Sequence, residues 1–170
     1  MNRFSLLIGI LLQFYAFPAQ TSIKKIASAN VKTMQGESFN TSRLNNNGKP
    51  MIVVMWRTDN RSCFQYFQAL NEELTDLQTQ TGVKVVIFSL DPPRTSPEVL
   101  PMVMARKWDF ESYIDTYQEF KSAMGVIGIP YTFVVNGKGE VVWEKHAYSP
   151  GMETEVFEIV RKLAKEEKAD

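Results

Sequence analysis

The sequence predicts a single α/β domain in which a central mixed β-sheet is flanked by helices and extended by an N-terminal β-hairpin. The apolar run at 50–56 and the mostly apolar run at 83–90 are typical of strands that are covered on both faces. The segment between them repeats apolar residues at helical spacing. Later in the chain, the turn formers Asn136-Gly137 separate two further strand-like runs. A strand–helix–strand order favours a right-handed parallel crossover, and the later hairpin is expected to be antiparallel.

Length, composition and charge narrow the class of protein. The chain has 170 residues, of which 44% are apolar, which is enough to build one core. Its 19 basic residues are balanced by 19 acidic ones. Because no basic surplus is present, we expect no nucleic-acid partner.

The N-terminal segment 1–20 differs from the rest of the chain. Arg3 is the only charged residue before Lys24, and an apolar run from Phe4 to Phe17 is followed by small residues. This pattern is typical of a secretory signal peptide. The run is too short to cross a bilayer comfortably, so we expect no stable membrane span in the mature form. Export follows, with the bacterial periplasm as the expected destination, and an uncleaved N-terminal anchor is the alternative.

The first half of the remaining chain is predicted to form a hairpin, a strand and a long helix. The hairpin covers 28–39 and turns at Gln35-Gly36. After the strand at 50–56, Asn60 is a good N-cap, and Gly82 ends the helical pattern. The apolar stripe of this helix comprises Cys63, Phe67, Leu70, Leu74 and Leu77.

The second half is predicted to contain three helices and the terminal hairpin. The link 91–101 holds four prolines, and the Ser96-Pro97 pair favours the start of a helix that ends near Trp108. Asp115-x-x-Gln118 resembles a capping box and predicts a short helix that ends at Gly125. The terminal hairpin is predicted from strands at 131–135 and 140–144. A last helix is expected to begin at Ser149-Pro150.

Two signatures give the chain a family resemblance. One runs from Trp56 to Cys63 and the other is Gly128-Ile129-Pro130 with the strand that follows. In this element order they are similar to those of thioredoxin-like proteins. The chain most resembles the exported bacterial TlpA/ResA type of thiol–disulfide oxidoreductase, over residues 28–166. The resemblance implies a thioredoxin-like fold and a cis-proline at Pro130.

The first signature departs from the family pattern. Family members carry Trp-Cys-x-x-Cys, whereas Asn60 stands here where the attacking cysteine belongs, and Cys63 takes the place of the resolving cysteine. Cys63 is the only cysteine in the chain. The resemblance therefore implies Cys63 as the candidate catalytic residue. It implies a protein- or peptide-binding groove formed by Trp56, Asn60, Ile129 and Pro130.

The chemistry leaves three functions open. Dithiol exchange needs one thiol to attack and a second to resolve the mixed disulfide, and Asn60 cannot form the covalent intermediate. Cys63 could form mixed disulfides with a protein or peptide thiol partner. Alternatively, the groove could bind extended peptides without redox chemistry. A single-cysteine peroxidase similar to the peroxiredoxins is the third hypothesis.

The state of the Cys63 thiol decides among these functions. A helix N-terminus favours a thiolate, whereas burial on an apolar stripe favours the neutral thiol. The sequence shows no zinc spacing and no phosphate loop, so we expect no metal and no cofactor. His146, the single histidine, is expected at the surface, and the methionines at 102 and 104 are expected to fill core space rather than bind copper.

Overall fold

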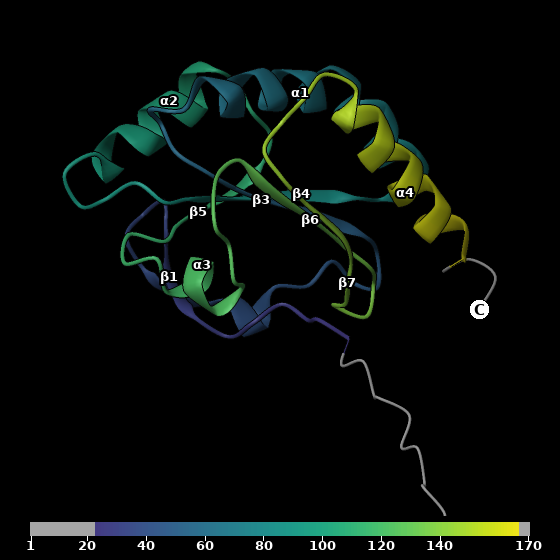
Figure 1. The fold of residues 1–170 in the computed structure, drawn as a ribbon, viewed down its shortest axis with the longest axis horizontal. Coiled ribbons are helices and arrows are strands. Elements are labelled where there is room, and N and C mark those ends of the chain that lie inside the picture. The colour runs from purple at the N-terminus through teal and green to yellow at the C-terminus, as the bar shows by residue number, and fades with distance from the viewer. Residues whose placement is uncertain (1–22, 167–170) are drawn as a thin grey trace, which may run out of the picture.

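The computed structural model describes residues 23–166, and these form one mixed β-sheet between two layers of helices (Figure 1). The predicted signal segment at 1–20 lies outside the described residues. None of the helices within the described range is both long and apolar enough to cross a bilayer. The helices are α1 (Arg61–Thr81), α2 (Val99–Ala105), α3 (Glu119–Ala123) and α4 (Met152–Glu166), with short 3-10 turns η1 (Thr41–Arg43) and η2 (Ser96–Glu98).

The sheet of the described region has seven strands in the order β2-β1-β5-β4-β3-β6-β7. Its three central strands run parallel, as two successive crossovers through α1 and α2 require, while β6 pairs antiparallel with β3. The predicted mixed sheet with flanking helices is confirmed. The strands are β1 (Asn30–Thr33), β2 (Ser38–Asn40), β3 (Met51–Trp56), β4 (Lys84–Ser89), β5 (Glu111–Ile114), β6 (Tyr131–Val135) and β7 (Val141–His146).

The helices divide the sheet into two faces. Helices α1, α2 and α4 lie together on one face, and α3 lies on the other, near β1 (Figure 1). Alternate residues of β3 therefore enter different cores: Ile52, Val54 and Trp56 pack under α1, whereas Val53 and Met55 pack on the α3 side. All six residues of β3 are buried, which explains its uniformly apolar sequence.

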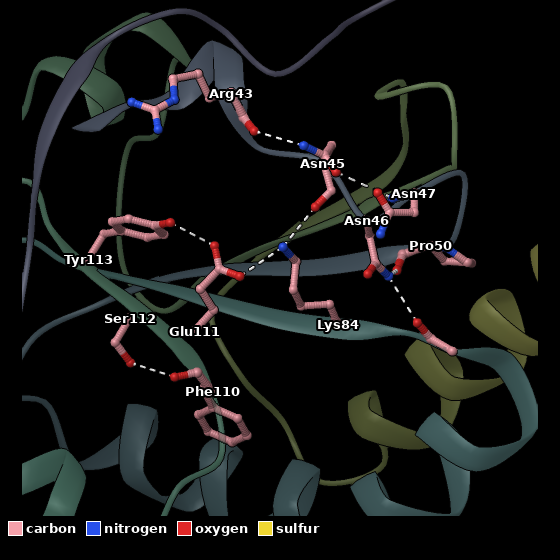
Figure 2. Close-up of polar contacts among 11 residues, drawn as sticks. Arg43, Asn45, Asn46, Asn47, Pro50, Lys84, Phe110, Glu111, Ser112 and Tyr113 are labelled. Atoms are coloured by element: carbon pink, nitrogen blue, oxygen red, sulfur yellow. Dashed lines mark hydrogen bonds and ion pairs between the residues drawn. The ribbon is translucent and has the colours of Figure 1, made fainter.

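Strand β5 was not predicted. It pairs parallel with β4 and antiparallel with β1, so it joins the N-terminal hairpin to the central sheet. Only four residues long and half polar, it carries no apolar run that marks it in the sequence. An ion pair joins it to β4: Lys84 Nζ lies 2.8 Å from a Glu111 carboxylate oxygen. Within β5, the Tyr113 hydroxyl donates to the same Glu111 side chain at 2.7 Å (Figure 2).

The asparagine loop before β3 is held against the same corner. The Asn46 side-chain amide donates to the backbone carbonyls of Pro50 and Gly82 at 2.8 and 2.9 Å (Figure 2). Lys84 Nζ also donates to the Asn45 carbonyl at 2.7 Å. These bonds lock the end of α1 to the start of β3, so the parallel β3–β4 pair begins in a defined register.

Two helix starts differ from the sequence prediction. The capping box at Asp115-x-x-Gln118 is wrong: α3 begins at Glu119, and Gln118 lies at its N-cap with a left-handed φ of 57°. The Asp115 carboxylate nevertheless accepts the Lys121 backbone N–H at 2.8 Å, and the helix ends before Gly125, as predicted. The last helix begins at Met152 rather than at Ser149-Pro150, because Ser149 closes a turn with Met152 ahead of it.

We predict that Phe67→Ala strongly destabilises the protein. Phe67 is fully buried and its ring contacts those of Trp56, Trp108 and Phe110, with centroids 4.9–5.5 Å apart. Truncation leaves a cavity under the sheet, and we expect a loss of about 3–5 kcal/mol in the free energy of unfolding. Urea denaturation measures it, with the exposed neighbour Gln68→Ala as the matched control. Equal losses for the two variants would show that the ring does not sit in a packed core.

Candidate functional site: the α1 N-terminus and the Pro130 edge

The first part of the site is the turn that joins β3 to α1. Strand β3 ends at Trp56, and the loop 57–60 leads directly into the helix. The Asn60 side-chain oxygen accepts the Cys63 backbone N–H at 3.1 Å, so the predicted N-cap is present. The side chain of Asn60 therefore caps the helix, and as an amide it has no thiol that could attack a disulfide.

Cys63 lies inside the core. Its side chain is fully buried and belongs to the cluster beneath α1. Burial raises the pKa of the thiol from 9.0 to about 12; hydrogen bonding to the Arg57 backbone works in the opposite direction, and the nearby carboxylate of Asp59 adds to the rise. Because the folded pKa exceeds the unfolded one, this burial contributes stability that is complete below about pH 9 and is lost as the pH rises towards 12.

Aromatic rings enclose the buried end of the site. The ring of Trp56 is fully buried and meets Phe67, Trp108 and Phe64 edge-on, at centroid distances of 5.3, 5.8 and 6.2 Å. The Arg106 guanidinium covers Phe64 from outside, 4.4 Å from the ring centroid. Trp56 can therefore shape a binding surface only through the residues that pack upon it.

A buried carboxylate ties the loop to the end of β4. Asp91 is 1% exposed, and it accepts hydrogen bonds from the Thr58 backbone N–H and from the hydroxyls of Thr58, Ser89 and Thr95. Four donors around one carboxylate compensate for its removal from water. These hydrogen bonds fix the loop 57–60. The sequence analysis missed the role of Asp91, because a single Asp after a strand is not part of a recognisable motif.

The second part of the site is the Pro130 edge, by which we mean residues 127–131. The Ile129–Pro130 peptide bond is cis. The register pairs Met55 with Tyr131, so Pro130 follows at the level of Trp56, beside the end of β3. Ile127 is 84% exposed and Ile129 is half-buried. In the described part of the chain, the backbone N–H and carbonyl of Ile129 have no hydrogen-bond partner.

His146, the last residue of β7, lies beside the Pro130 edge. Its ring stacks on Tyr131 with centroids 6.2 Å apart, and it lies so close to Gly128 that a Cβ atom there would be 2.1 Å from Nε2. A side chain at Gly128 would displace the imidazole. The histidine is exposed, as the sequence predicted, but its position beside the edge became visible only once the β6–β7 register placed it opposite Tyr131.

The structure thus separates the predicted site residues into two sets. Cys63, Trp56 and Pro130 are buried, whereas Asn60 and Ile129 are half-buried and reach the surface. Within residues 23–166, no group of three or more His, Cys, Asp or Glu side chains is placed to hold a metal ion. A thiol with so high a pKa is almost entirely neutral near pH 7, which disfavours nucleophilic attack on a disulfide or a peroxide.

Comparisons with known proteins agree with this fold. The model of the AhpC/TSA family matches residues 23–144. A thiol:disulfide interchange protein DsbE of Haemophilus influenzae is 25% identical over 119 residues, which is 69% of this chain. The match spans 62% of the length of that relative.

Solved structures give the same result. An uncharacterized thioredoxin-like protein of Porphyromonas gingivalis is 33% identical, with a TM-score of 0.75 over 83% of this chain and 92% of that one. The thioredoxin domain of a thiol-disulfide oxidoreductase from Bacteroides vulgatus superposes with a TM-score of 0.66 at 13% identity, over 86% of this chain and 99% of that one. At 15% identity, peroxiredoxin Q of Xanthomonas campestris superposes with a TM-score of 0.65, over 80% and 91% of the two chains. The last two similarities concern the fold alone.

We predict that Cys63 reacts slowly with iodoacetamide in the folded protein. With a pKa of about 12, roughly one thiol in ten thousand is ionised at pH 8, against about one in ten in the unfolded chain. The alkylation rate, followed by mass spectrometry from pH 6 to pH 10, should be at least about 100 times lower than in denaturant. A fast reaction with an apparent pKa below 8 would contradict the burial described here.

We also predict that Asp91→Asn loosens the site. The amide replaces an acceptor with an N–H₂ group that faces donors, so we expect the free energy of unfolding to fall by about 2–4 kcal/mol. Urea denaturation provides the measurement. Asp109→Asn, at an exposed position, is the control and should change stability by less than about 0.5 kcal/mol. A similar small change at both positions would mean that Asp91 does not anchor the loop.

Proposed function

Since this chain belongs to the AhpC/TSA family, as a thioredoxin-like member of the thiol–disulfide oxidoreductase type, we propose that it binds extended protein segments at the Pro130 edge without dithiol catalysis. The observation that carries the proposal is the contrast between the two parts of the site, the α1 N-terminus and the Pro130 edge. The side chain of Cys63, the single cysteine of the chain, is buried in the core, while the edge beside it presents apolar side chains to solvent.

The edge supplies what an extended peptide needs. The free N–H and carbonyl of Ile129 can pair with a peptide backbone, in the manner of strand addition to a sheet. Ile127 and the Tyr131–His146 pair flank that position and can contact peptide side chains. Backbone pairing supplies affinity, and the flanking side chains supply preference among sequences.

Loss of catalysis follows from the residues at the α1 N-terminus. Asn60 offers no sulfur for attack and instead caps the helix. A mixed disulfide at Cys63, the competing function, requires the first turn of α1 to open, since the side chain has no exposed surface. A peroxidase role needs a thiolate, which the pKa of about 12 disfavours.

Export is part of the proposal. The charge and apolar pattern of residues 1–20 supports cleavage of a signal peptide and delivery to the bacterial periplasm. We expect the protein recovered from a bacterial periplasmic extract to lack this segment by intact mass. Recovery of the uncleaved chain in the membrane fraction would instead support an N-terminal anchor.

We predict that peptide binding depends on the Pro130 edge and not on the thiol of Cys63. Short extended peptides, supplied in pairs that differ only by a central Cys or Ser, are to be titrated and followed by fluorescence anisotropy. Both members of a pair should bind alike, and Cys63→Ser should leave the dissociation constant within about twofold. Ile127→Asp should weaken binding by about tenfold or more, because it puts a charge in the apolar contact.

The matched control for the edge variant is Met104→Asp. Met104 was expected to fill core space, but the structure places it on α2 as an exposed apolar residue, 68% accessible. The Met104→Asp protein should bind the peptides with the same dissociation constant as the wild type. If the protein instead captures only the Cys peptides, and does so covalently, and if Cys63→Ser abolishes this capture, the mixed-disulfide function would replace this proposal.

A further inference from the structure

A cleft opens beside the N-terminal hairpin, and it shares no residue with the Pro130 edge. It has a volume of about 450 Å³ and is bounded on three sides. Lys32 and Met34 of the hairpin segment form one side, Pro97 and Leu100 of the η2–α2 segment form the second, and Ile114 and Tyr117 close the third. Volumes of about 300–1,000 Å³ are usual for small-molecule sites.

The cleft continues into two smaller hollows. One, of about 380 Å³, shares Met34 and Leu100 with it and reaches Phe110. The other, of about 210 Å³, shares Lys32 and Tyr117. The hollows therefore adjoin the cleft, and an unbranched ligand longer than the cleft can extend into one of them.

Its walls are apolar and incompletely covered. Leu100 is 37% exposed and Tyr117 is 74% exposed, two of the few large apolar side chains that the described region leaves open to solvent. Apolar side chains gathered around a hollow mark a binding surface more often than isolated ones do. A ligand with an apolar body would remove this surface from water.

One positive charge, that of the exposed Lys32, lines the cleft. The β1–β5 register pairs Lys32 with Ile114, so both side chains project from the same face of the sheet into the cleft. Within residues 23–166, the Lys32 ammonium has no ion pair or side-chain hydrogen bond. It therefore offers a counter-charge to an anion.

The carboxylates nearby limit the ligand to one negative charge. Glu119 borders the smaller hollow next to Lys32, and Glu111 borders the larger one, where Lys84 and Tyr113 already engage it. A second acidic group on the ligand would approach one of these side chains. A dicarboxylate is thus disfavoured.

We propose that this cleft binds a monocarboxylate with an unbranched apolar chain, its carboxylate paired with Lys32 and its chain lying between Leu100 and Tyr117. The proposal commits to a free small acid as the occupant. It is independent of peptide binding at the Pro130 edge, so either can fail alone.

The test uses octanoate as the probe, titrated into the isotopically labelled protein and followed by amide chemical shifts. A ligand of this size should saturate with a dissociation constant of about 1 mM or lower. The shifts should centre on 32–34, 100 and 114–117. Absence of saturation, or shifts centred elsewhere, would overturn the proposal.

Two variants test separately how the charge of Lys32 and the apolar wall at Leu100 contribute to binding. Lys32→Met should weaken octanoate binding by about fivefold while leaving the binding of neutral octanol unchanged. Leu100→Asp should abolish binding of both ligands, and its amide spectrum reports whether the fold is kept. The control, Lys138→Met, removes an exposed lysine in the β6–β7 turn and should have no effect. Equal affinities of the Lys32→Met protein and the wild type for octanoate would overturn the assignment of the carboxylate to Lys32.

Discussion

The state of the site depends on one constraint, the closure of the first turn of α1 over the end of β3. The Asn60 side chain caps the helix through the Cys63 backbone, and this places the sulfur among the rings beneath the helix. Burial then raises the thiol pKa to about 12, so the thiolate that exchange chemistry needs is scarce at neutral pH. A cysteine at position 60 would offer a second thiol, whereas asparagine stabilises the closed turn instead.

The surrounding polar contacts support the same closed arrangement. Asp91 accepts hydrogen bonds from Thr58, Ser89 and Thr95, and so connects the loop before α1 to the C-terminal end of β4. Beside this centre, within the described residues, the backbone N–H and carbonyl of Ile129 have no hydrogen-bond partner, and the side chain of Ile127 is exposed. The α1 N-terminus thus lacks the second thiol that exchange chemistry needs, and in our proposal the Pro130 edge acts by binding alone.

Much of the fold could be predicted because local signals and tertiary packing agree. The buried strand β3, the Asn60 cap and the Gly82 end of α1 each carry a strong local signal, and all are present. Strand β5 has no such signal, since its pairing depends on neighbours distant in sequence, such as Lys84 and the N-terminal hairpin. The helix dipole and burial pull the thiol pKa of Cys63 in opposite directions, and only the packed core shows that burial dominates. The parts played by Asp91 and His146 likewise follow from strand register, which a single sequence does not reveal.

The most direct test of the central claim is the reaction of the folded protein with a small aromatic disulfide at neutral pH, followed by intact mass alongside hydrogen exchange of the Cys63 and Phe64 amides. If the sulfur is sealed beneath α1, the mixed disulfide will form no faster than the first turn of the helix opens. Added denaturant will then accelerate both processes together. Rapid formation of the mixed disulfide while these amides stay protected would contradict the account, because it would show a thiol that is reactive in the closed fold.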